Sequence, residues 1–314
     1  MKTPKFWNRK NIISYSLLPL SLLYYLCYKI RCLINFKPYK SKIPIICVGN
    51  IVAGGSGKTP VAIEVAKILK KNNKTFCFLS KGYGGNFKGI VKLDSNSRAD
   101  VVGDEPLLLF ENGDVFVSKN RISGLKYINE NYDYDYIIMD DGLQNPTFYK
   151  DKVLLVIDGN FGIGNGFILP AGALRESFVD VYKKIDVVIL NNGDNEYIDK
   201  LCDKYNVDIV KSNIIAENAE KFKSDKYIAF CGLGRPEKFK KTLDDNGIQV
   251  IDFISFEDHH KYSDCDIEKM LKLGHKLITT KKDWVKLSNK YKNIVDCFNI
   301  FININADELE KILL

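Results

Sequence analysis

The segment 43–60 reads I-P-I-I-C-V-G-N-I-V-A-G-G-S-G-K-T-P. Its apolar beginning predicts a buried strand, and its glycine-rich part leads into a helix predicted over 58–71. In such a strand–loop–helix unit, backbone N–H groups turn toward phosphate oxygens, a lysine bridges the outer phosphates and a threonine hydroxyl binds Mg²⁺. Val52 stands where the usual pattern has its first glycine, but the remainder of the pattern is present. We therefore predict a phosphate-binding loop whose nucleotide ligands are Gly54, Gly55, Ser56, Gly57, Lys58 and Thr59, with Thr59 also serving a metal ion.

Short apolar runs alternate with amphipathic stretches on the C-terminal side of this loop. A first series predicts strands at 43–48, 75–80, 115–118, 136–140, 153–158 and 187–190, with helices at 58–71 and 121–131. Continuous apolar strands that alternate with helices indicate a parallel sheet covered on both faces. A second series predicts strands at 227–231, 250–254 and 276–279, with helices at 236–246, 263–273 and 306–314. The polar stretch 211–226 lies between the two series and is the predicted domain boundary.

The fold class that follows is α/β, with three parts. A basic and apolar N-terminal arm (1–42) contains a membrane-associating helix. A P-loop NTPase-like parallel sheet domain follows (43–215), and a smaller α/β C-terminal domain (216–314) closes the cleft. A chain of 314 residues is long enough for two such domains. The eight cysteines show no C-x-x-C pair, which favours reduced, mostly buried thiols over a disulfide framework or a zinc site.

The positive charge of the chain is concentrated in its N-terminal part. No acidic residue precedes Glu64, whereas ten basic residues do, so the rest of the chain carries 36 basic against 39 acidic residues. This asymmetry predicts that the arm contacts an anionic membrane surface, and it argues against a nucleic-acid partner for the body.

The stretch 11–28 is free of charge and has basic residues on both sides. A signal peptide would need a small-residue cleavage site, but this stretch ends in tyrosines and a basic run. A membrane-spanning helix needs about 20 apolar residues, and this segment is shorter and contains Pro19 and three serines. A helix that lies in the membrane interface fits best, because lysine, arginine and tyrosine can then stay at the headgroup level. The body would then lie in the cytoplasm, at the cytoplasmic face of a membrane.

Two acidic segments supply further candidate residues. Asp140 and Asp141 end the apolar strand predicted at 136–140, at the sheet edge where the loop lies and where an acidic residue completes a nucleotide and metal site. Asp104 and Glu105 precede the apolar run 107–110. They are either the start of a helix or the source of the carboxylate that a kinase needs to accept a hydroxyl proton.

His259 and His260 are adjacent in the sequence F-E-D-H-H-K-Y (256–262), and the chain has only three histidines. In an extended segment, neighbouring side chains point to opposite sides. At most one of the two should therefore face a site, and the spacing does not say which. A surface pair that follows a strand is the alternative.

Seven motifs occur in one order along the chain: N-I-V-A-G-G-S-G-K-T-P (50–60), S-K-G-Y-G-G (80–85), G-D-E-P (103–106), D-D-G-L-Q (140–144), P-A-G-A-L-R-E (170–176), D-H-H (258–260) and T-T-K-K-D (279–283). In this set and order the chain resembles the tetraacyldisaccharide 4′-kinases, the lipid A pathway kinases of Gram-negative bacteria. The resemblance covers most of the chain and includes the N-terminal arm. The departures are Lys81 for arginine, Ala173 for proline, Lys281 for glutamate and Asn145 for histidine.

This resemblance implies a function and a set of site residues. The family uses ATP and Mg²⁺ to phosphorylate the 4′-hydroxyl of a tetraacylated glucosamine disaccharide 1-phosphate, in a cleft between two α/β domains at the membrane face. It implies that Asp104 is the catalytic carboxylate, supported by His259 or His260. Glu105 and Asp141 would serve the metal region, Asp140 the nucleotide site, and the basic residues Arg121 and Arg175 the substrate. The expected location is the cytoplasmic face of the bacterial inner membrane.

Two other functions are compatible with parts of the pattern. A membrane-recruited switch ATPase would have a second lysine in its loop, but Ala53 occupies that position. A non-catalytic membrane adaptor would not need Lys58, Thr59, Asp104 and Asp141, all of which are present.

Overall fold

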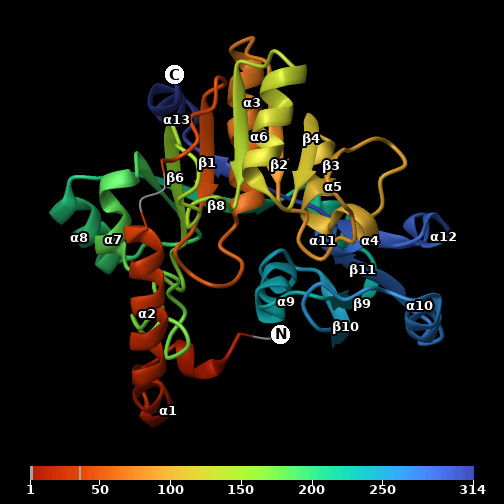
Figure 1. Cartoon of the computed structure of the whole chain (residues 1–314). Coiled ribbons are helices and arrows are strands. Elements are labelled where there is room, and N and C mark those ends of the chain that lie inside the picture. The colour runs from red at the N-terminus through yellow and green to blue at the C-terminus, as the bar shows by residue number, and fades with distance from the viewer. Residues whose placement is uncertain (1–2, 35–36) are drawn as a thin grey trace.

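A nine-stranded sheet forms the larger part of the molecule (Figure 1). The computed structural model describes residues 3–34 and 37–314. The strand order is β13-β8-β7-β6-β1-β5-β2-β4-β3. In this order the strands are Ile300–Ile304, Asp208–Ala216, Val187–Asn191, Lys152–Asp158, Ile45–Gly49, Tyr136–Asp140, Phe76–Ser80, Asp114–Ser118 and Ile90–Lys92. All pairs are parallel except the two at the edges, β13 with β8 and β3 with β4. The predicted α/β class with a large parallel sheet is confirmed.

Helices cover both faces of this sheet, as continuous apolar strands require. One face carries α3 (Lys58–Lys71), α4 (Ala99–Val102), α5 (Asp104–Phe110) and α13 (Ala306–Leu313), whose side chains join one buried apolar cluster. The other face carries α6 (Arg121–Asn131), α7 (Phe178–Val181) and α8 (Glu196–Tyr205) around a second cluster. Because the central strands are buried on both faces, the loops at their carboxyl ends are held on a rigid base.

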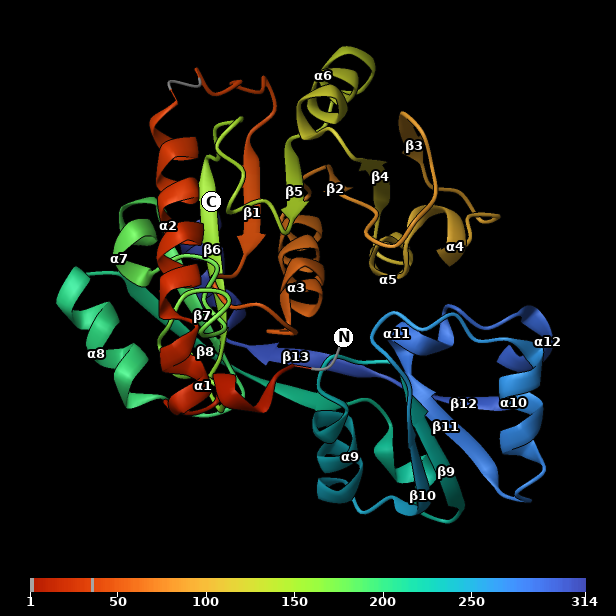
Figure 2. The ribbon, with the colours of Figure 1, turned by 60° about the horizontal axis from the view of Figure 1, so that its bottom comes forward.

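A second, four-stranded parallel sheet lies below the first in Figure 2. Its order is β10-β9-β11-β12, which are Gln249–Ser255, Lys226–Cys231, Lys276–Thr280 and Val295–Phe298. Its helices are α9 (Pro236–Asp245), α10 (Asp264–Leu271), α11 (Lys281–Trp284) and α12 (Asn289–Lys292). In the described part of the chain, short 3₁₀ turns lie at Lys5–Trp7, Tyr182–Lys184 and Ala219–Phe222.

The C-terminal residues pack on the large sheet and not in the C-terminal domain, where the sequence pattern placed them. The helix at 306–314 was expected in the C-terminal domain, but β13 pairs with β8 in the large sheet. Leu309 and Leu313 of α13 pack in the same apolar cluster as α3. The division at 215/216 is therefore wrong for residues 300–313, because burial of their apolar side chains against the larger core brings the chain back to it.

The N-terminal arm is helical, with α1 at Ile12–Ser16 and α2 at Leu18–Leu33. It packs along the segment 161–180, as Figures 1 and 2 show. The Ser21 hydroxyl donates to the carbonyl of Ile168 at 2.7 Å, and Trp7 Nε1 donates to the carbonyl of Pro170 at 3.0 Å. Within 3–34 and 37–314, no helix combines the length and the apolar character needed to cross a bilayer.

Candidate active site

The loop after β1 has the backbone geometry that a phosphate-binding loop requires. Gly57 adopts a positive φ of 88° at the N-terminus of α3, and a Cβ there would meet Asn191 Nδ2 at 2.5 Å. Two amides that sequence reasoning missed fix the loop from below: Asn50 Nδ2 donates to Ser56 Oγ at 3.0 Å, and Asn191 Nδ2 donates to the Ser56 carbonyl at 2.9 Å. Both asparagines follow or end strands at the same sheet edge, a signal by which they could have been found.

Lys58 points from the start of α3 toward the end of β5. Its Nζ lies 3.8 Å from Asp141 Oδ1, and Arg175 Nη1 donates to both oxygens of Asp141 at 3.2 and 3.3 Å. Burial alone would raise the pKa of Asp141, but Lys58 and Arg175 hold that pKa below its usual range. Asp141 is therefore a carboxylate held between two cations, next to the N-terminus of α3.

Asp140 is a strongly perturbed carboxyl group at the end of β5. It is buried, and within the described part of the chain its Oδ1 has no hydrogen-bond partner. Burial, followed by the charge of Glu105, raises its pKa to about 7. An unpaired buried carboxylate next to a phosphate loop is a place where a cation would restore charge balance.

These residues fit Mg²⁺ held together with a nucleotide rather than a metal held by protein alone. No group of three His, Cys, Asp or Glu side chains suited to a metal ion is present among residues 3–34 and 37–314. Mg²⁺ is typically bound by one or two carboxylates, with phosphate oxygens and water as its other ligands. The Oδ1 of Asp140, which has no hydrogen-bond partner among the described residues, fits such a ligand, and the charge of Lys58 acts on this carboxyl group.

Asp104 and His259 meet across the gap between the two sheets. Asp104 is buried at the start of α5, and His259 Nδ1 lies 2.9 Å from its Oδ2 and 3.1 Å from its Oδ1. Lys282 Nζ lies 3.8 Å from Asp104 Oδ2 and 3.5 Å from Glu105 Oε1. Burial alone would raise the pKa of Asp104, but the hydrogen bond with His259 and the charge of Lys282 lower it. The carboxylate is thus kept ionised by groups from the C-terminal domain.

The other histidine of the pair lies on the opposite side of its segment. His260 stacks on Phe256, with ring centroids 4.5 Å apart, and its Nε2 lies 3.3 Å from Asp266 Oδ2. Only His259 therefore contacts Asp104, and the positive φ of 60° at His259 turns its ring into the site. The expectation that the two rings diverge is met, although the segment is a turn rather than a strand.

Arg121 does not lie where a substrate could bind it. Only 6% of it is exposed, and its guanidinium donates to the carbonyls of Ser118 (3.2 Å) and Asp140 (3.1 Å). The expected contact with substrate is therefore corrected: Arg121 holds the ends of β4 and β5 together beneath the site. Arg175 is more exposed and remains available to a ligand.

A polar chain leads from Arg175 to the N-terminal arm. Arg175 Nη1 donates to Gln144 Oε1 at 3.4 Å, and Gln144 Nε2 donates to Glu176 Oε1 at 2.7 Å. Glu176 is buried, and its other oxygen accepts a hydrogen bond from the hydroxyl of Tyr28 in α2. Sequence reasoning missed Gln144, Glu176 and Tyr28 as members of the site region, because only the fold brings them together.

A phosphate loop, strand-end aspartates and a carboxylate met by a second domain define the class of P-loop phosphotransferases. Comparison with known proteins agrees. A family model described as "LpxK: Tetraacyldisaccharide-1-P 4'-kinase" matches residues 13–314. Proteins named "Tetraacyldisaccharide 4'-kinase" from Rickettsia canadensis (strain McKiel) and Rickettsia akari (strain Hartford) are each 37% identical to this chain, covering 98% of it and 96% of their own length.

A solved structure is also similar over nearly the whole chain. The "apo" form of LpxK from Aquifex aeolicus in complex with ATP superposes with a TM-score of 0.75 and 28% identity, covering 96% of this chain and 98% of that one. The chain belongs to the tetraacyldisaccharide 4′-kinase family. It is accordingly a kinase.

Proposed function

We propose that this kinase uses MgATP to phosphorylate the 4′-hydroxyl of a tetraacylated glucosamine disaccharide 1-phosphate in lipid A biosynthesis, with Asp104 as the base. The observation that supports it most is the contact between Asp104 and His259, which belong to different domains. A carboxylate so placed can accept the hydroxyl proton of a substrate bound between the domains. Lys282 adds positive charge beside it.

The remaining residues serve the nucleotide and the metal. The amides of Gly54, Gly55, Ser56 and Gly57 hold phosphate oxygens, and Lys58 stabilises negative charge on the outer phosphates. Thr59, Asp141 and Glu105 serve the metal, together with Asp140, whose buried Oδ1 has no hydrogen-bond partner among the described residues. Mg²⁺, when bound, neutralises charge that develops on the phosphate oxygens. Arg175 is the basic residue available to substrate.

Turnover of ATP with and without acylated disaccharide tests this function directly. A kinase consumes ATP in step with phosphorylation of the lipid and does little without it. Hydrolysis that is independent of the lipid would instead identify a switch ATPase. Binding of lipid without any turnover would identify an adaptor.

Replacing His259 with alanine should lower kcat by about ten- to a hundredfold, because a hydrogen bond to a charged group is worth roughly 1.5–3 kcal/mol. Asp104 would lose a partner that lowers its pKa, while its burial would remain. Its pKa should therefore rise, and the acidic limb of the pH profile of kcat should move to higher pH. His260→Ala is the matched control and should leave both kcat and the pH profile close to wild type. Equal effects of the two changes would contradict the assignment.

We also propose that α2 attaches the protein to the cytoplasmic face of the inner membrane. Large apolar side chains of the arm stay exposed after it packs on the body: Ile12, Ile13, Leu20, Leu22, Leu23, Leu26, Ile30 and Leu33. The arm also carries the excess basic charge of the chain. An apolar face with basic flanks suits an interfacial helix on anionic lipid.

Replacing Leu22, Leu23 and Leu26 with glutamine should release the protein from vesicles of anionic phospholipid. Each leucine is about half exposed, and burial of such a side chain is worth roughly 1.5–3 kcal/mol. Glutamine keeps helix propensity, and ATP binding should persist. Co-sedimentation with vesicles measures the effect, and Leu273→Gln, at an exposed site outside the arm, is the control. Undiminished sedimentation of the triple variant would show that another surface carries the contact.

A further inference from the structure

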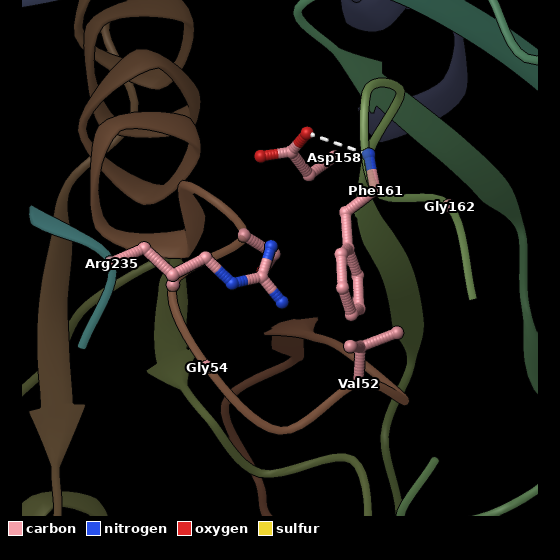
Figure 3. A pocket seen from close by; sticks show the side chains of 8 residues that line it. Val52, Gly54, Asp158, Phe161, Gly162 and Arg235 are labelled. Atoms are coloured by element: carbon pink, nitrogen blue, oxygen red, sulfur yellow. Dashed lines mark hydrogen bonds between the residues drawn. The ribbon is translucent and has the colours of Figure 1, made fainter. Parts of the chain in front are cut away.

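Arg235 of the C-terminal domain lies against the phosphate loop (Figure 3). It precedes α9, and only 9% of it is exposed. Its guanidinium carbon lies 3.5 Å from the centre of the Phe161 ring. The same side chain lines a small cavity together with Val52, Gly54, Gly55 and Ser56. A cation from the second domain is therefore buried beside the loop that holds phosphate.

Among the residues that the structure describes, no carboxylate lies within ion-pair distance of this guanidinium, and Glu237 acts on it only from farther away. Among the described residues, none accepts a hydrogen bond from it or forms an ion pair with it within 4 Å, so the Phe161 ring is its principal neighbour. Burial of an unpaired charge is costly, and buried cations are normally paired. A guanidinium presents a planar fork of donors that matches a phosphate group. The N–H donors of Arg235 thus face a phosphate-binding loop. A phosphate has the negative charge that would balance the guanidinium.

The neighbouring Lys238 differs from Arg235, because protein groups pair with its charge. Lys238, one turn further on, forms an ion pair with the buried Asp158 and donates to the Gly55 carbonyl at 3.3 Å. Its charge is therefore already satisfied by protein groups. At Gly54, a Cβ would lie 3.6 Å from Arg235 Nη2. The guanidinium therefore lies close to the loop at Gly54.

We propose that Arg235 binds the terminal phosphate of the nucleotide and stabilises charge on it during transfer. Gly54 lies three residues before the N-cap of α3, on the outer part of the loop, whereas the inner phosphates are expected at the amides nearest the helix. The same C-terminal domain brings His259 to Asp104. One domain would thus supply both the residue that orients the base and the cation on the transferring group, the role that an arginine supplied in cis plays in other P-loop enzymes.

Affinities for MgATP and MgADP, measured by calorimetry on the full chain, test this assignment. Arg235→Ala should weaken MgATP binding by roughly tenfold or more while leaving MgADP binding nearly unchanged, because only ATP has the terminal phosphate. It should also lower kcat by about 10²-fold or more. Arg235→Lys keeps the charge but not the fork, and should fall between wild type and Arg235→Ala. Equal weakening of ATP and ADP, or unchanged ATP affinity, would overturn the proposal.

Two control variants separate ligand binding from packing. Phe161→Leu removes the ring beneath the guanidinium and should affect ATP and ADP alike, so an ATP-selective loss there would show that the arginine acts through packing. Lys241→Ala removes a positive charge from the exposed side of α9 and should change neither affinity. Thermal unfolding checks that each variant is folded. If Arg235→Ala does not fold, the ATP-to-ADP comparison on Arg235→Lys decides.

Discussion

Replacing Lys58 with alanine should abolish phosphoryl transfer in a protein that stays folded. The lysine lies at the start of α3, and its side chain is 13% exposed in the ring of charges around Asp141. Electrostatic contacts to a transferring group are worth on the order of 10²–10³ in rate. Arg175 continues to pair with Asp141 after the change, so the fold should tolerate the loss. Transfer of labelled phosphate from ATP to the acylated disaccharide measures the effect.

Lys67→Ala provides a control on the same helix. Lys67 forms an exposed ion pair with Glu64 at 3.0 Å, and such surface pairs contribute little. This variant should therefore transfer phosphate at the wild-type rate. Near-normal turnover in a folded Lys58→Ala variant would mean that the loop does not hold the nucleotide.

The strands around this lysine could be predicted because they are buried on both sides. The runs at β1, β5 and β6 consist almost entirely of apolar residues, which is what a covered parallel sheet demands. β8 and β13 were missed for the opposite reason. β8 alternates between buried and exposed residues and lies next to the sheet edge, so the sequence pattern assigns its residues 211–216 to a polar boundary. The return of β13 to the first sheet has no local signal at all.

The site residues at the carboxyl ends of the parallel strands could be predicted from the sequence. Asp140 and Asp141 follow from the rule that parallel strands end together, and the same rule points to Asn191. The resemblance implies a substrate role for Arg121, but nothing in the local sequence shows that its guanidinium turns to the Ser118 and Asp140 carbonyls beneath the edge. No sequence pattern predicts a role for Arg235, because its place beside the loop depends on how the second domain packs against the first.

Among changes where the two domains meet, Asp104→Asn should lower kcat the most. Asparagine keeps the size and much of the hydrogen-bonding shape of the side chain but cannot accept the proton. General bases typically contribute about 10²–10⁴ in rate, so kcat should fall by that factor. Lys282 would retain Glu105 as a partner at 3.5 Å, which limits the cost of leaving that cation unpaired.

ATP affinity distinguishes a base from a metal ligand or a structural residue. Among the described residues, the Asp104 carboxylate contacts His259, Lys282 and the Glu105 amide, none of which belongs to the phosphate loop. MgATP should therefore bind Asp104→Asn about as tightly as the wild type. Asp100→Asn, four residues away in an exposed ion pair with Arg98, should leave both kcat and affinity unchanged.

If Asp104→Asn lost MgATP binding and showed no separate defect in transfer, Asp104 would be a metal or structural residue. The base would then have to be sought in Glu105 or Asp140. Asp140 is the weaker of these two, because only 2% of it is exposed and a substrate hydroxyl would have little access to it. Glu105 is more exposed but already lies 3.5 Å from Lys282. The geometry therefore favours Asp104, whose carboxylate alone is met by a histidine from the second domain among the residues that the structure describes at this cleft.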